Sequence, residues 1–97
     1  MKDLEKIKET IRQHRQELEQ KYKVKTIAIF GSYVRGEQKR KSDVDILVEF
    51  EKSVSLLHIV SLENYLSDIL GIKVDVVPKK NIREELRDAI LSEAIPI

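Results

Sequence analysis

The stretch GSYVRGEQKRKSDVDILVEF, residues 31–50, leads from a Gly-Ser turn through a basic loop to two aspartates at the head of an apolar run. Asp43 and Asp45 stand where the chain enters this β-branched run. Burying two carboxylates at the start of a hydrophobic strand is costly unless another group compensates their charge. The stretch therefore raises the question of what lies against Asp43 and Asp45.

Composition and charge narrow the class of protein. The 97 residues are expected to form one domain, residues 1–97, because so short a chain cannot supply two independent cores. Cysteine is absent, so any metal would be held by oxygen or imidazole ligands. The net charge of +1 does not favour general binding of nucleic acid. Met1 leads into a charged amphipathic segment and no long apolar span follows, so we expect a cytoplasmic protein that does not contact a membrane.

Apolar periodicity and turn residues predict the element order α-β-α-β-α-β-α. His14 falls on the apolar face of the first helix, where we expect a histidine at the edge of the core rather than a ligand. The expected elements are a helix over residues 3–22, a strand over 24–30, a short helix over 33–38 capped by Ser32, a strand over 44–50, a helix from Ser53 or Ser55 to Leu70, a strand over 72–77 and a last helix of about three turns capped by Asn81.

The third predicted helix carries more apolar residues than one buried face requires. One interpretation is a helix buried between the sheet and its neighbours. The other is a helix with a second apolar face for a partner protein, and the sequence favours neither. The apolar residues are Leu56, Leu57, Ile59, Val60, Leu62, Tyr65, Leu66, Ile69 and Leu70.

Three aspartates fall in predicted strands. Side chains alternate along a strand, so Asp43 and Asp45 point to the same side, roughly 7 Å apart at their Cα atoms. Asp75 interrupts the run IKVDVV, although Asp is depleted in strands and is rarely buried alone. If the last two strands are neighbours, as sequential strands usually are, the three carboxylates converge. Converging carboxylates either take up protons or hold cations, and such oxygen ligands suit Mg²⁺ or Mn²⁺.

Gly31 and Ser32 end the first predicted strand. Glycine lets the backbone approach a ligand closely, and a helix that starts at Ser32 would offer free N–H groups to a phosphate. If the first two strands are antiparallel, Gly31 lies beside the aspartates that begin the second strand. A Gly-Ser turn alone, or an Asp-x-Asp pair alone, is weak evidence. Together they fit a metal-bound triphosphate, so the compensating charge is expected to be Mg²⁺ carrying a nucleotide.

The spacing of these residues is similar to that of a known superfamily. Gly31-Ser32, ten intervening residues, Asp43-x-Asp45 and Asp75 on a later strand resemble the nucleotidyltransferase superfamily that includes DNA polymerase β. The quoted stretch resembles the minimal nucleotidyltransferases of bacteria and archaea, and the resemblance covers nearly the whole chain. It implies an α/β (α+β) nucleotidyltransferase fold in which helices pack a small mixed sheet.

The resemblance also implies a reaction and its residues. A hydroxyl would attack the α-phosphorus of ATP or another nucleoside triphosphate and release pyrophosphate, with two Mg²⁺ ions, or Mn²⁺, at the attacking and leaving oxygens. Arg35 matches a family arginine that contacts phosphate or braces the loop, whereas the basic residues 39–41 are expected to be solvated. The implied metal-binding and catalytic residues are Asp43, Asp45 and Asp75, the last also helping to activate the acceptor hydroxyl, and the implied nucleotide-binding residues are Gly31, Ser32 and Arg35.

The minimal members of this superfamily resemble the antitoxin half of a toxin–antitoxin pair whose other half is a helical HEPN ribonuclease encoded by a neighbouring gene. In such pairs the antitoxin transfers AMP from ATP to a tyrosine of the toxin, which is our leading hypothesis. The chain ends at Ile97 without the second domain of larger relatives, so base choice and acceptor are expected to come from a partner or from a second copy in a homodimer. Two alternatives stay open: an antitoxin that masks its partner by binding alone, and a nucleotidyltransferase that acts on RNA or a small molecule.

Overall fold

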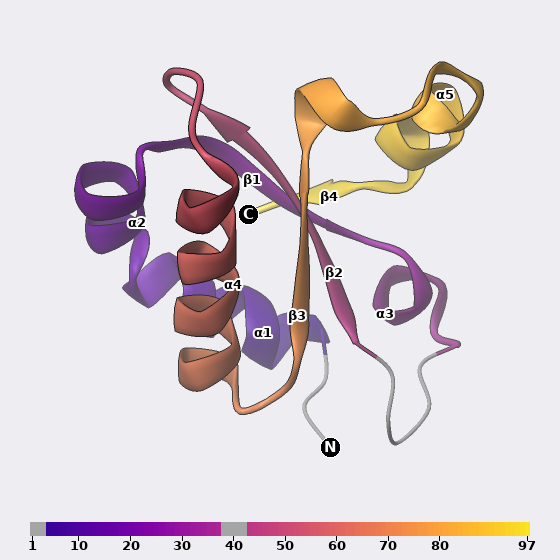
Figure 1. The fold of residues 1–97 in the computed structure, drawn as a ribbon. Coiled ribbons are helices and arrows are strands. Elements are labelled where there is room, and N and C mark those ends of the chain that lie inside the picture. Colours follow the sequence, from indigo (N-terminus) through magenta and orange to yellow (C-terminus); the bar gives the residue numbers. More distant parts are fainter. Residues whose placement is uncertain (1–3, 38–42) are drawn as a thin grey trace.

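A mixed sheet separates two groups of helices in the computed structural model, which describes residues 4–37 and 43–97 (Figure 1). Within these residues the strands are β1 (Val24–Phe30), β2 (Val44–Phe50), β3 (Val74–Pro78) and β4 (Ile95–Pro96), in the spatial order β3-β2-β1-β4. β1 is antiparallel to β2 and to β4, while β2 and β3 are parallel. The expected basic loop at residues 39–41 lies outside the described residues.

The helices are divided between the two faces of the sheet. As Figure 1 shows, α1 (Leu4–Gln13), α2 (Arg15–Tyr22) and α4 (Leu56–Leu70) lie on one side, and α3 (Ser32–Arg35) and α5 (Glu84–Glu93) lie on the other. A short 3₁₀ helix, η1 (Lys79–Asn81), leads from β3 toward α5. None of the helices in the described part of the chain is both long and apolar enough to span a membrane.

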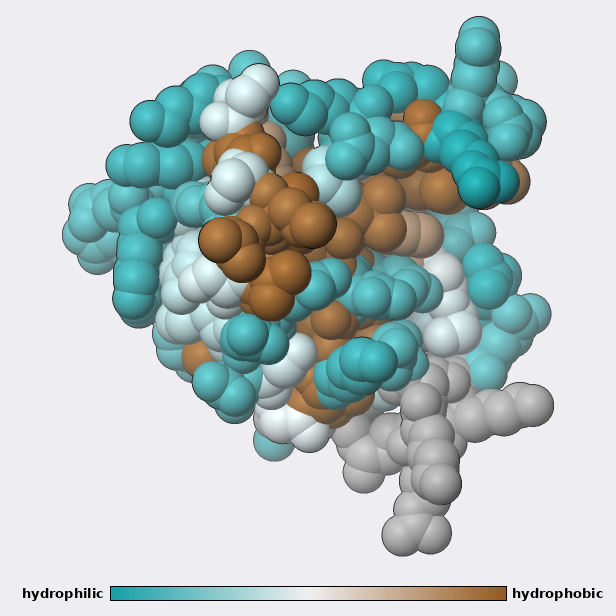
Figure 2. All heavy atoms as spheres, in the orientation of Figure 1, coloured by the Kyte–Doolittle hydropathy of each residue, from teal (hydrophilic) through white to brown (hydrophobic). Residues whose placement is uncertain are grey.

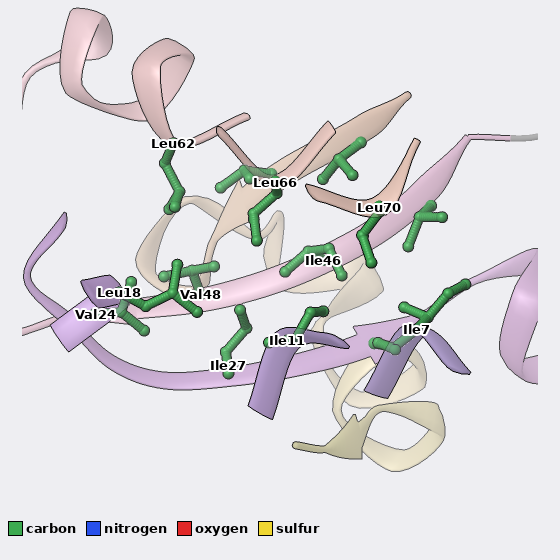
Figure 3. Close-up of a cluster of buried hydrophobic side chains, with 14 of the residues drawn as sticks. Ile7, Ile11, Leu18, Val24, Ile27, Ile46, Val48, Leu62, Leu66 and Leu70 are labelled. Carbon is green, nitrogen blue, oxygen red and sulfur yellow. The ribbon is translucent and has the colours of Figure 1, made fainter. Parts of the chain in front are cut away.

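The hydrophobic core fills the space between the sheet and α1, α2 and α4 (Figure 3). Side chains alternate along β2 and β3, so the core receives every second residue and the residues between them point to the opposite face. Asp45 and Asp75 are among the latter, which places both carboxylates on the face of the sheet that carries α3 and α5. Fully buried core residues include Ile7, Ile11, Leu18, Ile46, Val48, Leu62, Leu66 and Leu70.

The prediction of one helix over residues 3–22 is wrong, because the helix is interrupted at His14. The His14 backbone N–H donates to the carbonyl of Ile11 rather than to that of Thr10. The His14 ring nitrogen Nδ1 lies 2.8 Å from the Thr10 carbonyl oxygen and so takes the place of the missing backbone donor. A side chain that inserts into the helical hydrogen-bond ladder in this way bends or ends the helix. His14 is half-buried, in agreement with its expected place at the edge of the core.

The two central strands have the predicted ends, and other boundaries shift. The short helix begins at Ser32, with Gly31 at the N-cap position, so Ser32 is not the cap. It ends at Arg35, three residues before the predicted end, because the left-handed conformation of Gly36 stops it. β3 begins two residues later than predicted and includes Pro78. Asn81 belongs to η1 and does not cap α5, which has Arg83 at its N-cap without a side-chain hydrogen bond. The two-residue strand β4 was not predicted, because its pairing with β1 is a tertiary contact rather than a local pattern.

Helix α4 is buried along one side and exposed in its first turns. Ser55 caps the helix by accepting a hydrogen bond from the His58 N–H at 3.1 Å, as one of the two expected caps. Leu56, Leu57 and Val60 keep 75%, 80% and 41% of their surface exposed, and Figure 2 shows the apolar side chains that gather on the surface here. The interpretation that α4 is buried between the sheet and its neighbours is therefore wrong for the first turns of the helix. It holds for the side of the later turns that carries Leu62, Leu66 and Leu70.

Side chains of α4 cover the outer edge of β3. The Val74 N–H donates to Ser67 Oγ at 3.0 Å, and the Val76 N–H donates to Glu63 Oε2 at 2.8 Å. Backbone donors on an edge strand would otherwise be free to pair with another chain. These two bonds fix β3, and with it Asp75, against the body of the protein.

Substitution of a buried and an exposed leucine of α4 should separate core packing from surface contacts. Leu66→Ala leaves a cavity in the fully buried core and should lower the free energy of unfolding by about 2–5 kcal/mol. Leu57→Ala should change it by less than about 0.5 kcal/mol, because that side chain is exposed. Urea unfolding followed by circular dichroism measures both. Equal losses in the two variants would contradict this description of α4.

Candidate functional site

The strand register brings two of the predicted acids together. Asp45 is the partner of Asp75 across the parallel pair of β2 and β3. On its other side Asp45 is the partner of Phe30, the last residue of β1 and the neighbour of Gly31. The predictions that β2 and β3 are neighbours and that β1 and β2 are antiparallel are both confirmed. The Gly-Ser turn and the aspartates therefore share one end of the sheet.

Gly31 adopts a backbone conformation and a packing that require glycine. Its φ of 84° and ψ of −151° lie in a region that side chains disfavour. A Cβ atom at this position would lie 2.1 Å from Asp45 Oδ2, far inside van der Waals contact. The close approach that the sequence indicated is thus made, in this structure, to the carboxylate of Asp45.

The acids at this end of the sheet repel one another. The pKa of Asp45 is raised above its ordinary value, first because the group is partly buried and then because Asp75 and Asp43 are negative. Asp43 Oδ2 lies 4.0 Å from Lys73 Nζ, but that lysine is largely exposed, so the pair contributes little. The site as it stands therefore lacks full compensation for its negative charge.

The donor set fits a hard divalent cation that is also bound by substrate. No group of three His, Cys, Asp or Glu side chains among residues 4–37 and 43–97 forms a ready-made metal cage. Mg²⁺ does not need one, since it usually takes one or two carboxylates and completes its shell with water and phosphate oxygens. Asp45 and Asp75 supply such a pair, and a cation between them would relieve the repulsion that raises the pKa of Asp45.

Arg35 forms ion pairs with two glutamates. Its Nη1 donates to Glu93 Oε1 at 2.9 Å and to Oε2 at 3.2 Å, and its Nε donates to Glu37 Oε1 at 2.7 Å. These bonds, that with Glu37 first, raise the pKa of Arg35. Through these bonds Arg35 joins α3 to the end of α5.

Glu93 was not predicted as a site residue. Its Oε1 also accepts the Gly31 N–H at 2.5 Å, so one carboxylate contacts both Gly31 and Arg35. The contact spans 62 residues, which no local pattern reveals. One signal was present in the sequence: Glu93 is the last residue of α5, and a negative charge at a helix C-terminus is unfavourable unless a partner holds it.

Comparison with a family model decides the classification. The model of the nucleotidyltransferase domain matches residues 11–97, nearly the whole chain. The chain belongs to the nucleotidyltransferase family. It is an enzyme of the nucleotidyltransferase class, and the acids and the Gly-Ser turn at one end of its sheet are the motif on which the sequence resemblance was based.

The relatives and solved structures agree with this family. A protein of Methanocaldococcus jannaschii named as a protein adenylyltransferase is 58% identical over 82 residues, which cover 84% of each chain. The protein adenylyltransferase MntA of Thermococcus cleftensis is 44% identical over 95 residues, 98% of this chain and 96% of the relative. A solved minimal nucleotidyltransferase superposes with a TM-score of 0.82 at 35% identity and covers 99% of this chain and 97% of that one. A chain of a toxin–antitoxin complex crystallised with AMP-PNP superposes with a TM-score of 0.74 at 26% identity and covers 93% of this chain and 70% of that one.

Alanine in place of two glycines should distinguish the constraint at Gly31 from ordinary strain. Gly31→Ala adds the clash with Asp45 to an unfavourable backbone and should cost about 3 kcal/mol. Gly36→Ala has no atom of the described residues within 4 Å of the new Cβ and should cost only about 1 kcal/mol for its φ of 71°. Urea denaturation measures both. In the double variant Gly31→Ala/Asp45→Ala the losses should not add, because the clashing carboxylate is gone; strict additivity would contradict the contact.

Removal of the Asp45 charge should stabilise the metal-free protein. In EDTA at pH 7, Asp45→Asn should have a free energy of unfolding roughly 1 kcal/mol greater than that of the wild type, and therefore a higher melting temperature. The pKa of Asp45 is higher in the folded protein than in the unfolded chain, so the wild type loses stability as the pH rises between these two values. The loss is complete above the raised pKa of the folded protein. The difference should disappear as the pH falls toward about 4, the ordinary aspartate value. Asp88→Asn, on the exposed face of α5, is the control; a lower melting temperature for Asp45→Asn would show that Asp45 has a structural role instead.

Proposed function

We propose that this protein is the antitoxin of a HEPN-type toxin and inactivates it by transferring AMP from ATP to one of its tyrosines. The observation that carries the proposal is the register that sets Asp45 beside Asp75 and against Gly31. It is supported by the names of the relatives, which are protein adenylyltransferases. It is also supported by the toxin–antitoxin complex with AMP-PNP, an ATP analogue.

In this reaction the side chains would bind and orient the metals and the triphosphate, and one side chain would accept a proton. Mg²⁺, with Mn²⁺ as a substitute and two ions expected, would supply charge at the attacking and leaving oxygens. Asp43, Asp45 and Asp75 would hold the metals, and Gly31 and Ser32 would bind the triphosphate. Asp75 is exposed beside Asp45, so it would be accessible to accept the proton of the tyrosine hydroxyl. The bond from the tyrosine oxygen to the α-phosphorus forms, the α–β bridging bond breaks, and pyrophosphate leaves.

The acceptor in this proposal belongs to the partner. A toxin encoded by a neighbouring gene would bring both the tyrosine and the surface that orients it, and the two proteins would meet in the cytoplasm. A second copy of the chain, in a homodimer, is the alternative source of that surface. The exposed start of α4, with Leu56, Leu57 and Val60, is apolar surface available for either association.

Transfer of label tests the chemistry. Incubation of the protein with Mg²⁺, ATP labelled at the α-phosphate and the neighbour-encoded protein should label the neighbour. Asp43→Asn/Asp45→Asn should reduce labelling by more than about 100-fold, because the metal ligands are lost. Asp88→Asn should label like the wild type. Undiminished labelling by the double variant would remove these acids from the mechanism, and labelling of RNA in place of protein would identify a different acceptor.

Protection of cells separates chemistry from masking. If transfer neutralises the toxin, Asp43→Asn/Asp45→Asn should bind the toxin but fail to restore growth when the two are expressed together. Growth and co-purification are measured on the same strains, with Asp88→Asn again as the matched control. Full protection by the double variant would show that binding alone suffices.

A further inference from the structure

The carboxylate of Glu93 lies where three donated hydrogen bonds meet. Oε1 accepts from the Gly31 N–H at 2.5 Å and from Arg35 Nη1 at 2.9 Å, and Oε2 accepts from the same Nη1 at 3.2 Å. The Glu93 side chain keeps only 25% of its surface exposed, against 48% for Arg35. A backbone N–H and a guanidinium that converge on one oxygen form a site for an anion, and here the anion is part of the chain.

This position is otherwise unfavourable for a carboxylate. Glu93 is the last residue of α5, where the helix dipole repels negative charge, and no basic residue stands in the last turn to offset it. The negative charge of Glu93 also acts on Asp45, together with Asp75 and Asp43. Within residues 4–37 and 43–97, the Gly31 N–H and the Arg35 guanidinium are the donors that hold the Glu93 carboxylate in place. An anion with more charge and more oxygens, such as a triphosphate, can compete for the same donors.

We propose that Glu93 is an internal competitor of the nucleotide, which occupies the donors of Gly31 and Arg35 while the site is empty and is displaced by the phosphates. The proposal rests on the proposed function, because it assumes that a nucleoside triphosphate binds at the Gly31-Ser32 turn. It assigns Arg35 both of its expected roles in succession. With Glu93 in place Arg35 braces α5, and with Glu93 displaced it contacts phosphate.

The same displacement connects the nucleotide to the C-terminal helix. Gly31 and Arg35 are the contacts that hold the last turn of α5 against the turn after β1. β4 follows one residue later and pairs with β1 at Ala28 and Ile29. When the phosphates take the two donors, the last turn of α5 loses its anchor, so nucleotide binding loosens the end of α5.

A permanent brace would have the opposite consequence. If Glu93 shaped the site for the nucleotide by holding Arg35 in position, its removal would weaken nucleotide binding. If Glu93 is a competitor, its removal strengthens binding. The sign of the change in affinity therefore distinguishes the two roles.

Isothermal titration calorimetry at a fixed salt concentration measures the dissociation constants of Mg-ATP and of magnesium pyrophosphate. Glu93→Gln keeps the shape of the side chain but loses its charge, and it should bind both ligands about 5- to 10-fold more tightly than the wild type. Glu37→Gln is the matched control, because Glu37 also pairs with Arg35 but does not contact the Gly31 N–H. It should change the dissociation constants by less than about twofold, as expected for an exposed pair. Melting temperatures confirm that the variants are folded.

Hydrogen exchange of the wild type gives a second measurement that needs no variant. On addition of Mg-ATP, the amides of residues 90–94 should exchange faster, while those of β2 should be unchanged or slower. Weaker or unaltered binding by Glu93→Gln, or slower exchange at the end of α5, would overturn the inference and leave the proposed function standing. Absence of binding to the wild type in both titrations would overturn the proposed function, and the inference with it.

Discussion

The contact between the Cα of Gly31 and the carboxylate of Asp45 is the constraint on which the site depends. It leaves no space for a side chain at residue 31, so the turn after β1 must be glycine. It also fixes the distance between the end of β1 and the start of β2, since Phe30 and Asp45 are partners in the sheet. Because Asp45 is in register with Asp75 on the next strand, one close packing contact sets the relative positions of the turn and of both acids.

The charges around this contact are arranged for an additional ligand rather than for stability. Asp45 is partly buried beside two other acids, and burial with repulsion raises its pKa. Arg35 is a nearby cation, but its donors are shared between Glu37 and Glu93. A protein selected for stability alone would not keep so many carboxylates around one turn. Such an arrangement is expected where a metal and a highly charged substrate complete the balance.

The sequence predicted the parts of the fold that depend on local composition. β1 and β2 have the expected ends, because β-branched runs are bounded there by Gly31 and by polar residues. Asp75 was recognised because an aspartate between valines is unusual in a strand. The break at His14 was missed, since it arises when a ring nitrogen replaces a backbone donor, which periodicity does not report. Glu93 was missed because its partners lie 58 and 62 residues away.

The covered edge of β3 determines how this protein can join another chain. Ser67 and Glu63 occupy the N–H groups of Val74 and Val76 that a guest strand would need. The opposite edge is β4, which is only two residues long and ends at Pro96, a residue without an N–H. In the described part of the chain, neither β3 nor β4 therefore offers a run of free backbone donors for strand addition. A second protein that approaches either of these strands would have to bind through side-chain contacts, and the specificity of such a contact can evolve without altering the sheet that carries the acids.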